Sequence, residues 1–307
     1  MFELTQTSPG VWHETILYSF QDGADGGYPS IKLAFDAAGN LYGTTSQGTS
    51  NRGTVFQLSQ TSPGVWAIKT LYAFTGHADG AVPVSGVVLD ATGNIYGTAL
   101  IAGNTAKQCI IGQYDGCGVV FEISPSSGGW IYNVIHTFNG YNGALPRGIL
   151  LLKNGNLYGT TSSGGNVKFY GYGGFGVVFE LSPSAGGWTE TVLHVFGQNA
   201  APGNPYIDGK SPDSGVVFDA AGNLYGTTQY GGSGYGNVYK VSPTSNGWKE
   251  SSVHQFSNAN AAGDLRGLYP QGGVVVDGNG NIFGTTEEGG RGAGVLFEIT
   301  APAPAQK

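Results

Sequence analysis

This sequence has few basic residues and no long hydrophobic run. Its 307 residues include 13 Lys plus Arg against 20 Asp plus Glu, which gives a formal net charge of −7. Nucleic acids and anionic membrane surfaces are bound by clustered basic side chains, so the composition argues against both as partners. No apolar stretch approaches the ~18 residues of a membrane span, and the start at Met1 lacks the charged and apolar regions of an export signal. We therefore expect no membrane span, and we expect that any export signal has been removed or was never there.

Cysteine is scarce as well, since the only two, Cys109 and Cys117, lie in one long polar loop. A bridge between them would restrain a segment that has little core of its own, which favours a disulfide over two free thiols. Disulfides persist in oxidising compartments, so the pair predicts an extracytoplasmic protein, either secreted or on the cell surface. The spacing lacks the CxxC pairs or histidine partners that a zinc site needs.

Glycine, by contrast, is abundant, and it belongs to a repeat. The 55 glycines show no three-residue period and alternate with Val, Tyr, Phe and Thr, which is typical of a turn-rich all-β protein. The stretch Gly-Asn-Leu-Tyr-Gly-Thr-Thr occurs five times with few changes, at residues 39–45, 93–99, 155–161, 222–228 and 280–286. Self-similarity at such a period indicates a repeat architecture.

Each repeat contains four strand-like runs. An apolar run after a proline suits a strand that is buried on both faces. It is followed by the Gly-Asn-Leu-Tyr-Gly-Thr-Thr run, by a Val-Phe-Glu-Leu type of run, and by a run from tryptophan to phenylalanine. A four-stranded unit cannot bury its faces alone, whereas radial repetition buries them for every unit. The sequence therefore predicts an all-β, five-bladed β-propeller with four antiparallel strands per blade.

The repeats make residues 1–300 a single propeller domain, followed by a Pro/Ala tail or linker at 301–307. We expect residues 11–20 to pair as the outer strand of the C-terminal blade, which closes the ring. Residues 2–4, a sixth run of the third type, then have no place in their own ring, and they are either a loosely docked terminus or a strand donated to another chain. The predicted blades are approximately residues 21–74, 75–138, 139–196, 197–256, and 257–300 together with 1–20.

The fourth run of each repeat carries a tryptophan and, eight residues later, a phenylalanine, as in Trp188 and Phe196. The even separation predicts that both side chains pack on one face of a strand. Three of the five histidines, His136, His194 and His254, lie at one position of this run, where the other repeats have tyrosine. That exchange indicates an aromatic packing position rather than a catalytic base.

Taken together, these motifs resemble a known family. The motifs that carry the resemblance are, in order, Asp-x-x-Gly-Asn-Leu-Tyr-Gly-Thr-Thr, Gly-Gly, Gly-x-Val-Phe-Glu-Leu and Trp-x-Glu-x-x-Leu-x-x-Phe. The chain is similar to the GloVer-type tandem repeat (choice-of-anchor) of bacterial secreted and surface proteins, which is distantly NHL-like. The resemblance covers about residues 2–300. It implies a β-propeller in an exported bacterial protein, and it brings no set of catalytic residues with it.

A candidate cation site comes from the motif Asp-Gly-x-x-Pro before the first strand, at Asp25, Asp79 and Asp208. Asn142 stands at the same position in the third repeat, and Arg266 in the fifth. One interpretation is a β-turn that uses Asp and Gly for their backbone preferences. The other is a ring of carboxylates near the central channel that binds a cation such as Ca²⁺. Apart from this site we expect no cofactor.

The loops that join strands two to three and four to one are long and differ between repeats, and in a blade both sets emerge on one face. A rigid scaffold with irregular loops gathered on one side is typical of a binding surface. Tyrosines in these loops would stack on a sugar ring or anchor a protein, although such a side chain can also merely pin its loop. The candidates are Tyr114, Tyr141, Tyr170, Tyr172, Tyr206, Tyr230, Tyr235 and Tyr269.

These observations lead to one main functional hypothesis and two alternatives. The main hypothesis is a non-enzymatic extracytoplasmic propeller that binds a glycan or a protein through its long-loop face. The first alternative is a structural subunit that self-assembles into an extracellular filament by donating its N-terminal strand. The second is a glycan-active hydrolase or lyase with carboxylates at the central channel.

Overall fold

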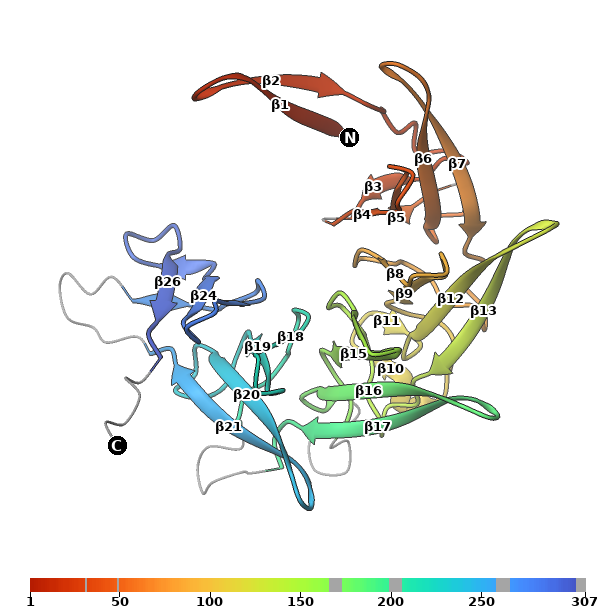
Figure 1. Ribbon diagram of the computed structural model, residues 1–307. Helices are drawn as coiled ribbons and strands as arrows, with labels where there is room; N and C mark the ends of the chain where they lie inside the picture. The colour runs from red at the N-terminus through yellow and green to blue at the C-terminus, as the bar shows by residue number, and fades with distance from the viewer. Residues whose placement is uncertain (31, 49, 166–172, 199–205, 258–265, 302–307) are drawn as a thin grey trace.

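The computed structural model describes residues 1–30, 32–48, 50–165, 173–198, 206–257 and 266–301. Within these residues, small antiparallel sheets stand side by side in an arc around a central channel (Figure 1). The one helical segment described is the short 3-10 helix η1 (Lys107–Cys109). No helix in this part of the chain is long and apolar enough to cross a membrane. The arrangement of the sheets around the channel confirms the predicted all-β, five-bladed propeller.

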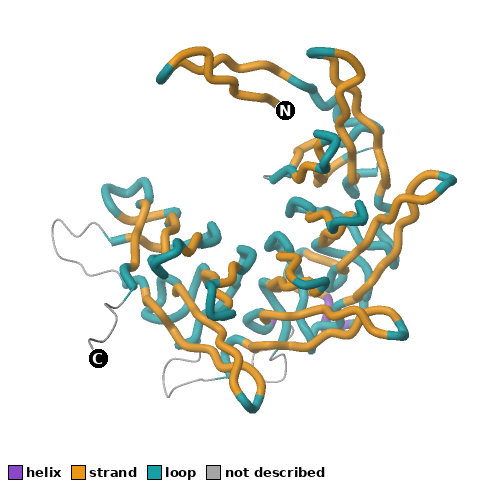
Figure 2. The backbone as a smooth tube through the Cα atoms, viewed as in Figure 1, coloured by secondary structure: helices purple, strands orange, loops and turns teal. Residues whose placement is uncertain are grey.

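The blades share one strand order, with a first strand of only two or three residues at the channel and two long strands at the perimeter (Figure 2). Blade 1 consists of β3 (Gly27–Pro29), β4 (Ala34–Phe35), β5 (Leu41–Gln47), β6 (Thr54–Ser62) and β7 (Val65–Ala73). Blade 2 consists of β8 (Val88–Leu89), β9 (Ile95–Ala99), β12 (Val119–Ser126) and β13 (Gly129–Thr137). Blade 3 consists of β14 (Leu151–Lys153), β15 (Asn156–Thr161), β16 (Val177–Ser184) and β17 (Gly187–Val195).

Blades 4 and 5 continue the arc, but blade 5 has no fourth strand among the residues described. Blade 4 consists of β18 (Val217–Phe218), β19 (Leu224–Thr228), β20 (Asn237–Thr244) and β21 (Gly247–Gln255). Blade 5 consists of β23 (Val275–Val276), β24 (Ile282–Thr285) and β26 (Leu296–Ile299), beside the short pair β22 (Gly267–Leu268) and β25 (Glu288–Gly289).

The turn between the first and second strands is built by the repeated aspartate. Asp90 Oδ1 accepts hydrogen bonds from the backbone N–H groups of Thr92 and Asn94, and its Oδ2 accepts one from the hydroxyl of Tyr96. The same turn is formed by three other repeats, at Asp36, Asp219 and Asp277. The Asp-x-x-Gly-Asn motif is thus a local turn that brings the second strand alongside the first.

The fourth strand packs differently from the prediction, because it contains a β-bulge. In blade 2, Val120 lies opposite His136 whereas Phe121 lies opposite Val134, so one extra residue interrupts the alternation of β13. Beyond a bulge, the side chains that would have pointed to one face of the sheet point to the other. The tryptophan before the bulge and the phenylalanine after it therefore lie on opposite faces rather than on one. Phe138 contacts Phe179 of the following blade, with ring centroids 5.2 Å apart. The phenylalanine is buried, as are its counterparts in three other repeats, while the tryptophan is half-buried.

Neighbouring blades are joined by a contact that recurs at four blade boundaries, which we call the seam. The repeated proline of one blade lies on the repeated glycine that begins the third strand of the preceding blade. A Cβ atom on Gly118 would lie 2.6 Å from Cδ of Pro146, so no larger residue fits there. The other three pairs are Gly53 with Pro83, Gly176 with Pro212, and Gly236 with Pro270.

Two sets of hydrogen bonds accompany the seam. The residue before each of these prolines has a left-handed backbone, and its N–H donates to the preceding blade, as Leu145 (φ 57°) donates to the carbonyl of Cys117 at 2.9 Å. In blades 1, 3 and 4 the first threonine of the Gly-Thr-Thr motif donates to the next blade, as Thr160 Oγ1 donates to the carbonyl of Ser214 at 2.6 Å. The strained φ is therefore held by a structural hydrogen bond.

The predicted ring closure is not present in this structure. Strand β2 (Val11–Ile16) pairs with β1 (Phe2–Ser8) as an N-terminal hairpin, and β26 pairs with β24 alone. Residues 2–4, which were predicted to have no place in their own ring, lie in this hairpin outside the five blades, with Phe2 opposite Ile16. The physical reason is that β1 and β26 are the same type of strand, but only a tight turn separates β1 from β2, so that pairing closes a much shorter loop.

The predicted disulfide is present between Cys109 and Cys117, with Cα atoms 4.7 Å apart. Both cysteines are fully buried in the cluster that also contains Phe138 and Leu145. The bridge closes the loop of blade 2 that carries η1 and the small hairpin of β10 (Ile110–Ile111) and β11 (Tyr114–Asp115). It therefore ties this loop to the hydrophobic core.

We expect Phe196→Ala to destabilise the protein strongly. Phe196 is fully buried and its ring lies 5.1 Å from that of Tyr239 in blade 4. Removal of a buried aromatic ring costs ~3–5 kcal/mol of unfolding free energy, which urea denaturation would measure. The matched control is Trp188→Ala, which removes a half-buried ring and should cost less. Equal losses for the two variants would contradict the packing described here.

We expect the double variant Cys109→Ala/Cys117→Ala to lose ~2–3 kcal/mol of stability, because the bridge restrains a short loop in the unfolded chain. Thermal unfolding of oxidised and variant protein would measure the loss. Mass spectrometry of the non-reduced protein checks the bridge itself, and the detection of two alkylatable thiols would refute it.

Candidate functional site

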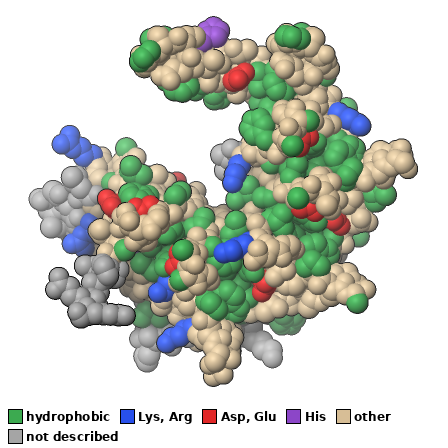
Figure 3. All heavy atoms as spheres, viewed as in Figure 1, with side chains coloured by type: hydrophobic (Ala, Val, Ile, Leu, Met, Phe, Trp, Pro, Cys, Tyr) green, Lys and Arg blue, Asp and Glu red, His purple; other side chains and the backbone are tan. Residues whose placement is uncertain are grey.

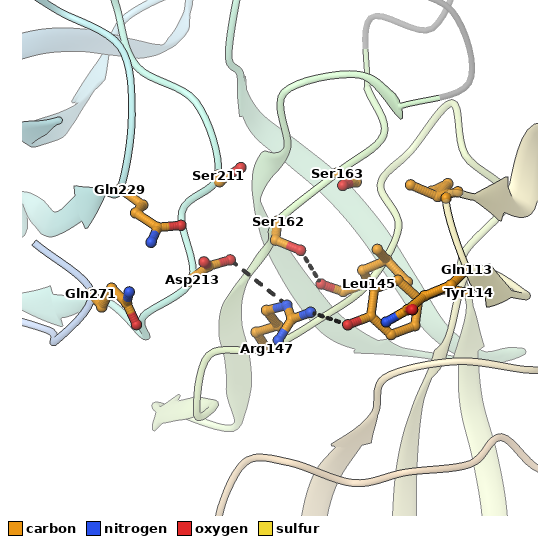
Figure 4. A pocket seen from close by; sticks show the side chains of 12 residues that line it. Gln113, Tyr114, Leu145, Arg147, Ser162, Ser163, Ser211, Asp213, Gln229 and Gln271 are labelled. Atoms are coloured by element: carbon orange, nitrogen blue, oxygen red, sulfur yellow. Dashed lines mark hydrogen bonds and ion pairs between the residues drawn. The ribbon is translucent and has the colours of Figure 1, made fainter. Parts of the chain in front are cut away.

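A cavity among the described residues lies at the mouth of the central channel, on the long-loop face. It measures about 650 Å³ and is bordered by the starts of first strands, the ends of second strands, and the disulfide-closed loop (Figure 4). We call it the mouth cavity. Its lining residues are Ile111, Gly112, Gln113, Tyr114, Leu145, Arg147, Ser162, Ser163, Ser211, Asp213, Gln229 and Gln271.

The polar residues of the mouth cavity come from two positions of the repeat. Arg147, Asp213 and Gln271 each directly follow the repeated proline. Ser162 and Gln229 each directly follow the repeated Thr-Thr. At both positions the repeats differ from one another, although the flanking residues agree. Our sequence analysis did not single out these residues, and this local variation inside a constant frame is the signal that would have found them.

The seam fixes the backbone beneath these side chains. Ser211, two residues before Asp213, has a left-handed backbone (φ 56°), and its N–H donates to the carbonyl of Phe175 at 3.0 Å. Leu145, two residues before Arg147, is held in the same way. A side chain on such a rigid frame loses little freedom when a ligand binds, which favours recognition.

Arg147 is the centre of the polar groups. Its Nη2 donates a hydrogen bond to the hydroxyl of Tyr114 at 3.0 Å, and its Nε lies 3.9 Å from Oδ1 of Asp213. Figure 4 shows the three side chains meeting from three segments of the chain. The hydrogen bond from Arg147 lowers the pKa of Tyr114 from its usual value. The disulfide-closed loop thus places Tyr114 over the channel against a charged group from the next blade.

Asp213 is the one carboxylate that lines this cavity among the described residues. Burial raises the pKa of Asp213 to about 6, and Arg147 opposes that shift. Oδ1 is buried without a hydrogen-bond partner, because 3.9 Å to Arg147 exceeds hydrogen-bonding distance. Unpaired polar atoms at such a depth are costly, and the Asp213 side chain is still 23% exposed, which makes it a candidate to bind ligand groups.

A second cavity of about 450 Å³ continues into the channel, where Arg147, Asp213 and Gln271 also line it. Its remaining walls are mostly first-strand residues with apolar side chains, including Val84 and Val274. The space at the channel is therefore polar at its mouth and apolar below. A ligand with hydroxyl groups would be held at the mouth rather than inside the channel.

The predicted tyrosines fall into several groups. Tyr114 lines the mouth cavity. Tyr230 and Tyr235 flank Tyr269, with ring centroids 5.6 and 5.5 Å from it, and Tyr230 follows the cavity residue Gln229. Tyr206 packs on Phe175 at 5.2 Å, and Tyr141 is exposed in a different loop. Tyr170 and Tyr172 lie outside the described residues.

The predicted cation-binding aspartates are not brought together. Asp25 and Asp79 each accept a hydrogen bond from a tyrosine hydroxyl at 2.9 Å and others from the backbone of their own turn. Asp208 accepts from the N–H of Gly197 and lies 3.2 Å from Nε2 of His194. The described residues contain no cluster of three or more His, Cys, Asp or Glu side chains suited to a metal ion. In blades 1 and 2 these aspartates instead accept hydrogen bonds within a local turn, which agrees with the β-turn interpretation.

The histidines pack at blade boundaries, as predicted. His136 lies edge-on to Phe138, with ring centroids 4.7 Å apart, and His194 and His254 make the corresponding contact with their own phenylalanines. Burial lowers the pKa of His136 to about 4, so it is neutral at pH 7. Glu190 of blade 3 accepts a hydrogen bond from Asn142 at 2.7 Å, and burial raises its pKa to about 7. These titratable groups join blades rather than line the cavity.

Comparison with solved structures gives only distant likeness. A gluconolactonase from Xanthomonas campestris matches with a TM-score of 0.47 and 15% identity over 87% of this chain and 71% of that one. A polysaccharide lyase, Uly1, matches with a TM-score of 0.45 and 14% identity over 89% of this chain and 57% of that one. Such values carry no argument about activity.

Sequence comparison identifies a family. No curated protein matches this chain. The family model described as the Gloeobacter/Verrucomicrobia repeat matches residues 1–207 and again residues 110–306. These matches span nearly the whole chain and agree with the resemblance carried by its motifs. The protein therefore belongs to the Gloeobacter/Verrucomicrobia repeat family.

Proposed function

We propose that this propeller binds a glycan at the mouth cavity. The observation that carries the proposal is the set of polar side chains around Arg147 and Asp213, where donor and acceptor groups meet on a rigid frame. Sugar hydroxyls both donate and accept hydrogen bonds. The Asp213 carboxylate would accept from one hydroxyl while the Arg147 guanidinium and the Gln229 and Gln271 amides donate to others.

The size and shape of the mouth cavity support the same ligand class. A volume of about 650 Å³ lies within the range of pockets that hold small ligands. The ring of Tyr114, fixed by Arg147, offers a flat surface beside these polar groups, and sugar rings stack on such faces. The nearby cluster of Tyr230, Tyr235 and Tyr269 would extend the site along a longer chain of sugars.

An extracytoplasmic location is part of this proposal. The Cys109–Cys117 bridge supports it, because disulfides form and persist in oxidising compartments. The bridge also helps to form the site, because the loop that it closes places Tyr114 in the wall of the mouth cavity.

A protein ligand and a glycan-active enzyme are the competing functions. The exposed tyrosines at the rim would suit a protein anchor equally well. Hydrolysis of a glycosidic bond uses two carboxylates ~5–9.5 Å apart, and the described lining of the mouth cavity includes one, Asp213. The experiments below separate these functions from glycan binding.

We expect Asp213→Asn and Arg147→Ala to weaken glycan binding by roughly 10- to 100-fold, because each removes a charge-assisted hydrogen bond. A glycan array would identify the ligand, and calorimetry would measure its affinity for each variant. The matched control is Ser30→Ala, at the same repeat position as Asp213 but outside the described cavity lining. Equal loss in the control, or no glycan bound on the array, would reject the proposal. Release of shortened glycans on incubation would point to an enzyme instead.

Binding should also depend on pH. Burial raises the pKa of Asp213 to about 6, so the carboxylate becomes protonated as the pH falls through that value. The charged acceptor is then lost, and we expect affinity to fall between pH 7 and pH 5. Calorimetry across this range would measure the change, and Asp213→Asn should remove most of it. The same pH dependence in that variant would assign it to another group.

A further inference from the structure

At each end of the arc of blades, one half of a seam has no partner blade. At the C-terminal end, which we call the tail, this half is the glycine side of the seam, in blade 5. Leu296 is 78% exposed, whereas the residues at its position in the other four blades, Val55, Val120, Val178 and Val238, are completely buried by the following blade. Gly294 stands where four other glycines are buried under a proline, and within the described part of the chain the atoms nearest to its Cβ position belong to Thr286 and Glu287 instead. Blade 5 therefore presents a surface shaped for a following blade.

The head end lies in blade 1. Pro29 is exposed, whereas the corresponding prolines of the other four blades, Pro83, Pro146, Pro212 and Pro270, are buried on the glycine of the preceding blade. Tyr28 has the same left-handed backbone (φ 53°) as the other residues that precede these prolines, and it is 68% exposed. Blade 1 therefore presents a surface shaped for a preceding blade.

The strand that blade 5 lacks is present elsewhere in the chain. Strand β2 has the Trp-to-Phe sequence of a fourth strand, and in the structure it pairs with β1. Its partner in a complete blade would be a third strand, and β26 is a third strand with an open outer edge. The register of blade 2, where Phe121 lies opposite Val134, would place Phe297 of β26 opposite Ile16 of β2. Phe2 occupies that place on β2 in this structure.

We propose that this chain associates head to tail with a second copy, so that β2 of one copy becomes the fourth strand of blade 5 in the other. The exchange replaces β1 by β26, a strand of the same type, and keeps the register of the complete blades. It also brings Pro29 of one copy to Gly294 of the other, because a blade completed by β2 directly precedes blade 1. The transfer of β2 to the second copy therefore pairs the open edge of β26 and also completes the seam between Gly294 and Pro29.

A second copy fits these surfaces better than the other end of the same chain. The arc places β2 and β26 on opposite sides of an opening (Figure 1). Each seam consists of a proline in direct contact with a glycine together with short hydrogen bonds, so closure within one chain would require the seams to bend. A second copy that is offset along the channel axis would meet either end with every seam unchanged, whereas two arcs in one plane would overlap (Figure 1). Because the contacting surfaces differ, the contact is heterologous, and each added copy leaves one free head and one free tail for the next.

The proposal involves edge pairing and apolar burial rather than charge. Hydrophobic side chains on the hairpin, Phe2, Leu4, Trp12 and Ile16, are each more than half exposed. The space-filling view shows acidic and basic side chains scattered singly over the visible face (Figure 3). Exposed strand edges beside apolar side chains are the surfaces through which sheets pair between molecules. The association should therefore persist in high salt.

Cross-linking of two variants tests the pairing. The blade 2 register, Glu122 opposite Asn133, predicts that Glu298 of one copy lies opposite Thr15 of another. We expect a mixture of Thr15→Cys and Glu298→Cys proteins to form a disulfide between these positions on mild oxidation, identified by its linked peptides. The matched control is Asn133→Cys, at the position of Thr15 in a complete blade, and it should form no bridge with Glu298→Cys.

Sedimentation and a double variant complete the test. We expect the full chain to sediment as a concentration-dependent series of oligomers, and we expect Leu296→Asp to shift it to monomer, with unchanged melting because Leu296 is exposed. A Thr15→Cys/Glu298→Cys chain that forms the bridge only within itself would overturn the proposal in favour of ring closure. Absence of the bridge, or a full chain that remains monomeric at all concentrations, would overturn it as well.

Discussion

The whole architecture depends on one contact, a proline of each blade lying on a glycine of the blade before it. The contact leaves no room for a Cβ atom, so Gly53, Gly118, Gly176 and Gly236 cannot be exchanged for other residues without displacing a neighbouring blade. It also fixes the left-handed residue before the proline, whose N–H pairs with the preceding blade. The angle between blades, and hence the curvature of the arc, follows from this contact and from the threonine hydrogen bond beside it.

The same contact positions the mouth cavity. The seam contacts hold the backbone of the residue after each proline at the entrance of the channel, yet the side chain of that residue takes no part in the seam. The repeats are therefore free to differ there, and they place Arg147, Asp213 and Gln271 side by side. The constant positions build the frame, and the variable positions supply the chemistry. This division resembles that of other scaffolds in which rigid elements present variable residues.

The proposed binding site and the proposed association surfaces lie in different parts of the molecule. The mouth cavity is formed by blades 2 to 5 and takes Gln271 from blade 5, whereas the open halves of the seam lie at Pro29 in blade 1 and at Leu296 in blade 5. A head-to-tail series of copies would therefore leave each cavity accessible. Several cavities in one assembly would bind a repetitive glycan with greater strength than a single cavity, because later contacts become intramolecular. Modest affinity at one site would then suffice.

The sequence by itself determined the repeat, the number of blades, the turn at each Asp-x-x-Gly-Asn, the disulfide and the face on which the long loops gather. These features depend on local spacing, which a repeat makes explicit. Only the tertiary structure decided the rest. The bulge in the fourth strand arises from pairing with the third strand, and it sends Trp130 and Phe138 to opposite faces. The choice of β1 over β26 as the partner of β2 is a competition between equivalent strands that sequence similarity cannot resolve. The meeting of Tyr114, Arg147 and Asp213 joins three blades, because the seam sets where each segment reaches the channel.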